Sequence, residues 1–116
     1  MPEPAAGLLD RACALLDAEA APPGELKDLV RELARAFAAG HPGRSVEVRV
    51  PPYVAVQCVE GPRHTRGTPP NVVETDPLTW LGLCCGRVQW GEAVRDGRLR
   101  ASGERADLSG LLPWRP

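Results

Sequence analysis

The sequence lacks the features of a membrane-spanning, secreted or nucleic-acid-binding protein. Its apolar residues make up 43% of 116 positions, but no apolar run approaches the roughly 20 residues that span a bilayer. Basic and acidic residues nearly balance, 14 against 15, and no basic stripe suits nucleic acid or an anionic membrane. Glu3 and Pro4 stand where a secretory signal would be basic. We therefore expect a cytoplasmic protein with no nucleic-acid partner and no integral membrane association.

Residues that carry catalysis or bind metals are also scarce. His41 and His64 are the only histidines, so one chain cannot form a three-histidine zinc site. Ser109 precedes Gly110 but lacks the G-x-S-x-G context of an activated serine. A nucleophile pair of Cys58 with His64 has no supporting motif, and a Val-rich strand would bury that thiol. The sequence thus predicts no catalytic residue, no metal site and no cofactor.

The cysteines are few and irregularly spaced. Two are adjacent, and no pair has the C-x-x-C spacing of redox or zinc motifs. Free thiols fit a reducing compartment, where cysteines serve as small apolar core residues. We expect no disulfide among Cys13, Cys58, Cys84 and Cys85.

Two helices are predicted in the first third of the chain, over about residues 4–19 and 24–39. The second has the clearer pattern, because apolar residues recur at helical spacing with charged residues between them. A run of Ala, Pro, Pro and Gly at 21–24 separates the helices, and Gly40 and Pro42 end the second. We expect a helical hairpin over one face of a sheet. The stripe consists of Leu26, Leu29, Val30, Leu33, Ala34 and Phe37.

From residue 45 the apolar period changes from 3.6 to 2, which predicts strands. Valines alternate with Glu47 and Arg49. Asp76 and Pro77 have the chemistry of a helix start, and Gly86 that of a helix end. Strands are expected at about 45–50, 53–59, 72–74 and 99–102, with helices at 76–86, 90–96 and 106–112.

The last third of the sequence contains a series of features in a fixed order. The first of these features is a helix that ends at Gly86-Arg87, and the second is a short helix that contains Ala93. After them come Gly97, Leu99 and Gly103, and then a closing segment over 106–112. This series resembles sterol-carrier-protein-like domains, in particular their small stand-alone bacterial members, of which the stretch at 60–77 looks like a signature. The resemblance covers roughly residues 25–114.

The resemblance implies an α/β (α+β) fold, with a curved, mostly antiparallel sheet of about five strands and helices packed on one face. Residues 1–116 would form a single domain, with an N-terminal helix at 4–19 and a core at about 24–114. The implied function is non-enzymatic binding of a hydrophobic or amphipathic, lipid-like small molecule between the sheet and the helices.

Two other functions stay open. The chain could be a protein-interaction or accessory module with a filled core and no ligand, as a homodimer or with a protein partner. It could also assist an enzyme of the mycothiol-dependent isomerase type, because related domains occur at the C-terminus of such enzymes.

The candidate binding residues fall into two groups. For the apolar lining we expect Trp80, Leu83, Trp90 and Leu99, although the tryptophans would serve equally as core anchors. For an anionic head group we expect a cluster in the loop at 60–71, where guanidiniums can hold a phosphate or carboxylate. Alternatively these arginines pair with Glu74 and Asp76 and are structural. The cluster consists of Arg63, His64 and Arg66.

Overall fold

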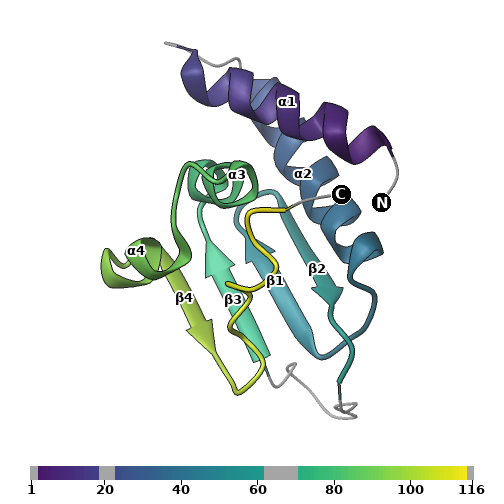
Figure 1. Ribbon diagram of the computed structural model, residues 1–116, viewed down its shortest axis with the longest axis vertical. Helices are drawn as coiled ribbons and strands as arrows, with labels where there is room; N and C mark the ends of the chain where they lie inside the picture. Colours follow the sequence, from purple (N-terminus) through teal and green to yellow (C-terminus); the bar gives the residue numbers. More distant parts are fainter. Residues whose placement is uncertain (1–2, 19–22, 62–70, 115–116) are drawn as a thin grey trace.

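The computed structural model describes residues 3–18, 23–61 and 71–114. The chain forms four helices and four strands in these segments (Figure 1). The helices expected at 4–19 and 24–39 are present within one or two residues at each end. In chain order the elements are α1 (Glu3–Asp17), α2 (Pro23–Gly40), β1 (Val46–Val50), β2 (Val54–Cys58), β3 (Asn71–Thr75), α3 (Pro77–Cys85), α4 (Trp90–Arg95) and β4 (Leu99–Ser102).

The strands form one mixed sheet in the order β2-β1-β3-β4. The pairs β1–β2 and β3–β4 are antiparallel, whereas the central pair β1–β3 is parallel. The α+β fold class and the mostly antiparallel sheet are therefore confirmed. The strand number differs, since the described residues contain four strands rather than about five.

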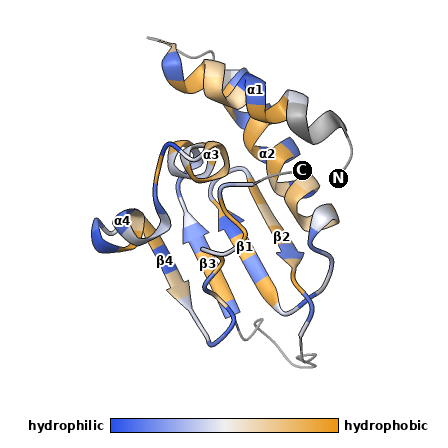
Figure 2. Ribbon diagram, viewed as in Figure 1, coloured by the Kyte–Doolittle hydropathy of each residue, from blue (hydrophilic) through white to orange (hydrophobic). Residues whose placement is uncertain are grey.

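Each central strand has one buried side, as the period-2 pattern predicts. In β1 the side chains of Val46, Val48 and Val50 are fully buried, while Glu47 and Arg49 are half-buried on the opposite face. Figure 2 shows this alternation of apolar and polar residues along the strands. The sheet therefore has an apolar face toward the core and an open face with charged side chains.

The apolar stripe of α2 supplies much of the core. Leu29, Val30, Leu33, Ala34 and Phe37 all have no exposed surface, and the helix packs against β2. Around Phe37 the aromatic rings meet edge-on, with Trp80 at a centroid distance of 5.7 Å and Trp114 at 5.9 Å. Edge-to-face contacts at this distance stabilise a core beyond simple burial. The structure thus confirms the predicted stripe from Leu29 to Phe37, whereas Leu26 at its start is half-buried.

Capping residues fix both ends of α3. The Asp76 carboxylate accepts hydrogen bonds from the Thr79 amide at 2.9 Å and from the Thr79 hydroxyl at 2.7 Å. At the other end Gly86 adopts a left-handed conformation with φ of 81°, which favours glycine because other residues clash there. Both ends agree with the sequence prediction.

The prediction of a final helix at 106–112 is wrong. The segment has no regular secondary structure there apart from a turn at 109–111, and Asp107 Oδ1 accepts a hydrogen bond from the Ser109 amide at 2.9 Å. Such a local bond competes with helix formation, and a segment this short gains little from helix propagation. In this irregular path the side chains of Ala106, Leu108, Leu112 and Trp114 are buried.

Candidate functional site

The predicted head-group cluster Arg63, His64 and Arg66 lies outside the described residues. Its neighbour Asn71 is described and has a structural role. The side-chain amide donates to the Ser45 carbonyl at 2.7 Å and accepts from the Arg105 amide at 2.9 Å. Asn71 therefore joins the start of β1 and β3 to the C-terminal segment, and both of its polar atoms are engaged.

The predicted apolar lining lies mostly in the packed core. Trp80 and Leu83 are each 1% exposed and Leu99 is 2% exposed, while Trp90 is half-buried. The Trp80 indole N–H has no hydrogen-bond partner among the described residues. A buried donor without an acceptor costs about 1–3 kcal/mol, so this N–H is a candidate contact for a ligand or water acceptor.

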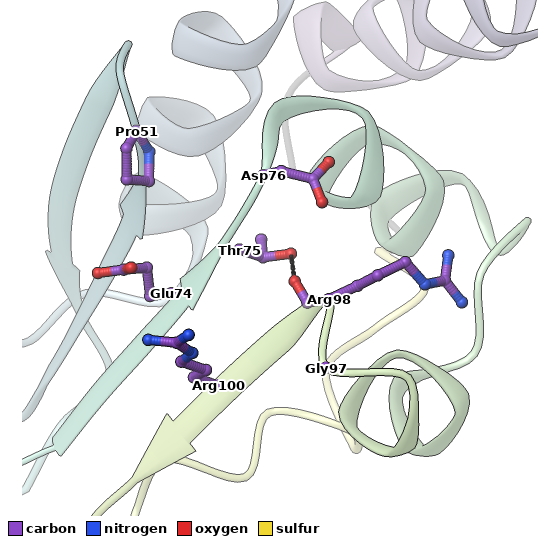
Figure 3. A pocket seen from close by; sticks show the side chains of 7 residues that line it. All are labelled: Pro51, Glu74, Thr75, Asp76, Gly97, Arg98 and Arg100. Carbon is purple, nitrogen blue, oxygen red and sulfur yellow. Dashed lines mark hydrogen bonds between the residues drawn. The ribbon is translucent and has the colours of Figure 1, made fainter.

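A polar pocket of about 430 Å³ lies on the open face of the sheet, where β1 and β3 end and β4 begins (Figure 3). Glu74 on β3 stands opposite Arg100 on β4, and the Thr75 hydroxyl donates to the Arg98 carbonyl at 2.8 Å. Arg98 is paired with Asp96 at 2.9 Å and Glu92 at 3.3 Å. Charged side chains dominate this pocket, so it is unsuited to an apolar molecule.

A second pocket, here called the α1 pocket, has a volume of about 500 Å³. One wall is α1, and the other consists of the end of α3 and the C-terminal segment. Its volume falls in the range of about 300–1,000 Å³ that holds small molecules. The lining combines apolar side chains and thiols with two polar groups: Leu9, Asp10, Cys13, Cys84, Cys85, Gly86, Gln89, Pro113 and Trp114.

Trp114 links the α1 pocket to the predicted lining. It lies in the pocket wall, and its amide donates to the Cys84 carbonyl at 3.1 Å. Its ring packs edge-on against Phe37, which in turn packs against Trp80. The sequence does not single out Trp114, because nothing local shows that the C-terminal segment folds back against α3.

Two thiols of the α1 pocket, those of Cys84 and Cys85, are protonated at neutral pH. Burial raises the pKa of Cys84 well above its usual value. Burial also raises the pKa of Cys85 to about 12, with a further contribution from the neighbouring Cys13. A neutral thiol behaves as a small, weakly polar group, so these two residues add no charge to the pocket. In the structure all four cysteines are free.

An ion pair connects the end of α1 to the residue that follows α3. The Arg87 guanidinium donates to both carboxylate oxygens of Asp17, one of them at 3.1 Å. The hydrogen bond from Arg87 lowers the pKa of Asp17. Both side chains are exposed, so this pair contributes little to stability but orients α1 beside the pocket.

Within residues 3–18, 23–61 and 71–114, no three His, Cys, Asp or Glu side chains are arranged to hold a metal ion. Of the helices described, none is both long and apolar enough to cross a bilayer.

The fold and its pockets define a small α+β domain with helices on one side of a mixed sheet. The family model described as "Bacterial SCP ortholog" matches residues 24–114. The chain therefore belongs to this bacterial family of sterol-carrier-protein orthologues, as its sequence resemblance implied. No curated protein matches the chain. Helix α1 precedes the matched segment.

Proposed function

We propose that this protein is a non-enzymatic carrier that binds a hydrophobic or amphipathic small molecule in the α1 pocket. The observation that carries the proposal is the position of Trp114, which lies in the pocket wall and contacts the Phe37–Trp80 cluster. A ligand entering beside Trp114 would reach aromatic surface continuous with the predicted lining. Membership of a sterol-carrier-type family supports the same class of ligand.

The polar groups of the pocket favour a particular kind of amphiphile. The Asp10 carboxylate accepts hydrogen bonds and repels anions, and the Gln89 amide can also accept. An apolar body with a hydroxyl group suits this lining better than a free carboxylate does. The anionic head group predicted at Arg63, His64 and Arg66 would require a contribution from outside the described residues.

The test is binding of decanol and decanoate, followed by two-dimensional NMR of the labelled protein. We expect decanol to shift the Trp114 indole signal and the amides of α1, with at least about tenfold weaker binding of decanoate, a difference of about 1.4 kcal/mol. Shifts confined to other surfaces, or no binding of either compound, would refute the α1 pocket as a ligand site.

A pair of neighbouring substitutions controls for changes in α1 itself. Cys13 lines the pocket, whereas the next residue, Ala14, is exposed on the same helix. Cys13→Phe would fill the cavity and abolish decanol binding. Ala14→Phe adds the same ring outside the pocket and should leave binding unchanged. Equal binding by both variants would contradict the proposal.

The alternative of a protein-interaction module has weaker support. Two large hydrophobic side chains stand out as exposed among the described residues, Leu78 at 52% and Val94 at 44%. Single exposed apolar side chains are common on monomeric proteins and do not define an interface. We therefore retain the carrier function as the proposal, and a failure to bind either amphiphile would favour the module.

A further inference from the structure

Two thiols from distant parts of the chain meet where α1 lies on α3. The Cys85 thiol donates a weak hydrogen bond to the Leu9 carbonyl oxygen, with 3.8 Å between the two heavy atoms. Within the helix Glu3–Asp17 that carbonyl is also the expected acceptor for the amide of Cys13, four residues later. Cys85 therefore sits against the same turn of α1 that carries Cys13, and both residues line the α1 pocket.

Exposure distinguishes this pair from the other two cysteines. Cys13 and Cys85 are half-buried and both line the α1 pocket, so a small oxidant dissolved in water can reach them. Cys58 and Cys84 are buried. Cys84 precedes Cys85 on α3, and adjacent helical residues point in different directions, which is poor geometry for a mutual disulfide.

We propose that Cys13 and Cys85 are a site of reversible oxidation, at which a peroxide converts the two thiols into a disulfide that ties α1 to α3. One thiol first loses its proton, and the resulting thiolate attacks a peroxide oxygen. The O–O bond breaks, the released hydroxide takes up the proton, and a sulfenic acid and one water form. The second thiol then attacks the sulfenic sulfur. The S–S bond forms, the S–O bond breaks, and a second water leaves. Two electrons pass from the sulfurs to the peroxide, and a low-molecular-weight thiol reverses the change.

The consequence is control over the docking of α1. In the reduced protein α1 is held by side-chain packing and the exposed Asp17–Arg87 pair, and such an attachment opens locally more readily than the core unfolds. A disulfide makes the attachment covalent and keeps the wall of the α1 pocket in place. This inference does not depend on a ligand, because the disulfide forms whether or not the pocket binds one.

The experiment treats the reduced full-length chain with hydrogen peroxide and then alkylates the remaining thiols. We expect two free thiols instead of four, and a tryptic cross-link between the peptides Ala12–Lys27 and Gly67–Arg87. Because the second peptide contains both Cys84 and Cys85, the variants decide the assignment. Cys84→Ser should retain the cross-link, whereas Cys85→Ser and Cys13→Ser should lose it.

Hydrogen exchange provides a second measurement that needs no substitution. The amides of α1 should exchange at least about tenfold more slowly after oxidation, as expected when local opening is suppressed, and a reductant should restore the original rate. Four free thiols after peroxide, a cross-link that survives Cys85→Ser, or a disulfide between two molecules would each overturn the proposal. So would a disulfide that leaves the exchange of α1 unchanged.

Discussion

Helices α1 and α2 are both amphipathic and lie side by side, yet they have different roles in the molecule (Figures 1 and 2). In α2 five side chains have no exposed surface. Among the α1 side chains that the structure describes, Ala12 and Leu15 are buried, while Leu8, Leu9 and Leu16 are half-buried. Helix α2 packs on the sheet, whereas α1 packs mainly on α2 and α3.

The family match divides the two helices in the same way, because it begins at Gly24 and so includes α2 but not α1. A helix that packs on other helices and leaves much of its apolar side half-buried contributes less burial free energy than one enclosed by a sheet. We infer that α2 is part of the folding core and that α1 is an attached element able to open without global unfolding. The predictions below test this difference.

The largest effect is expected for Leu33→Ala in α2. The Leu33 side chain has no exposed surface, so its truncation leaves a cavity and should lower the free energy of unfolding by about 2–5 kcal/mol. Urea denaturation followed by circular dichroism measures this change. A midpoint equal to that of the unmodified protein would show that α2 is not enclosed as described.

A smaller loss of unfolding free energy is expected for Asn71→Ala, which tests the hydrogen bonds of a buried polar side chain. The substitution leaves the buried Ser45 carbonyl without its partner, which costs about 1–3 kcal/mol. Water can take the place of Asn71 at the amide of exposed Arg105, so this second bond adds little. Gln57→Ala is the control, because exposed Gln57 only accepts from the Arg44 side chain. Similar unfolding midpoints for the two variants would argue against a structural role of Asn71.

The contrast between the helices also explains what the sequence could predict. The stripe of α2, the alternation in β1 and the caps of α3 depend on neighbours within a few residues, so local spacing was sufficient. The parallel pairing of β1 with β3 joins segments separated by β2, and no local pattern specifies it. The segment at 106–112 was mistaken for a helix because its apolar spacing fits either structure when tertiary contacts are unknown.

The candidate site was less predictable for the same reason. Trp80, Leu83 and Leu99, which the sequence predicts as an apolar ligand lining, are buried in the core, but spacing alone does not distinguish a packed core from a ligand cavity. The α1 pocket requires that Cys13, Gln89 and Trp114 come together from three distant segments. Only the path of the C-terminal segment brings them there.

Leu15→Ala in α1 is the counterpart of Leu33→Ala and should have a smaller effect. Leu15 is 6% exposed and has half-buried neighbours that can rearrange, so we expect a cost of about 2 kcal/mol or less, at the bottom of the usual range. The lost stability should appear as weaker docking of α1 on the rest of the molecule. Amides of α1 should exchange about tenfold faster or more, while those of β1 change little. Equal acceleration in α1 and β1 would show that both helices unfold together with the core.

The smallest effect is expected for Asp17→Asn, which removes the ion pair with Arg87 at the end of α1. Because Arg87 lowers the pKa of Asp17 below its usual 3.8, the folded protein binds this proton less readily than the unfolded chain does. The stabilisation is therefore present above pH 3.8 and is lost as the pH falls through the lowered pKa.

In the unmodified protein the protection of α1 amides should decline in this acid range, and high salt at neutral pH should weaken it slightly. In Asp17→Asn the α1 amides should already be less protected at neutral pH, and the decline in the acid range that depends on Asp17 should be absent. Asp28→Asn, at an exposed position of α2, should behave like the unmodified protein. If Asp17→Asn retains the full acid response, the docking of α1 is controlled by groups other than this pair.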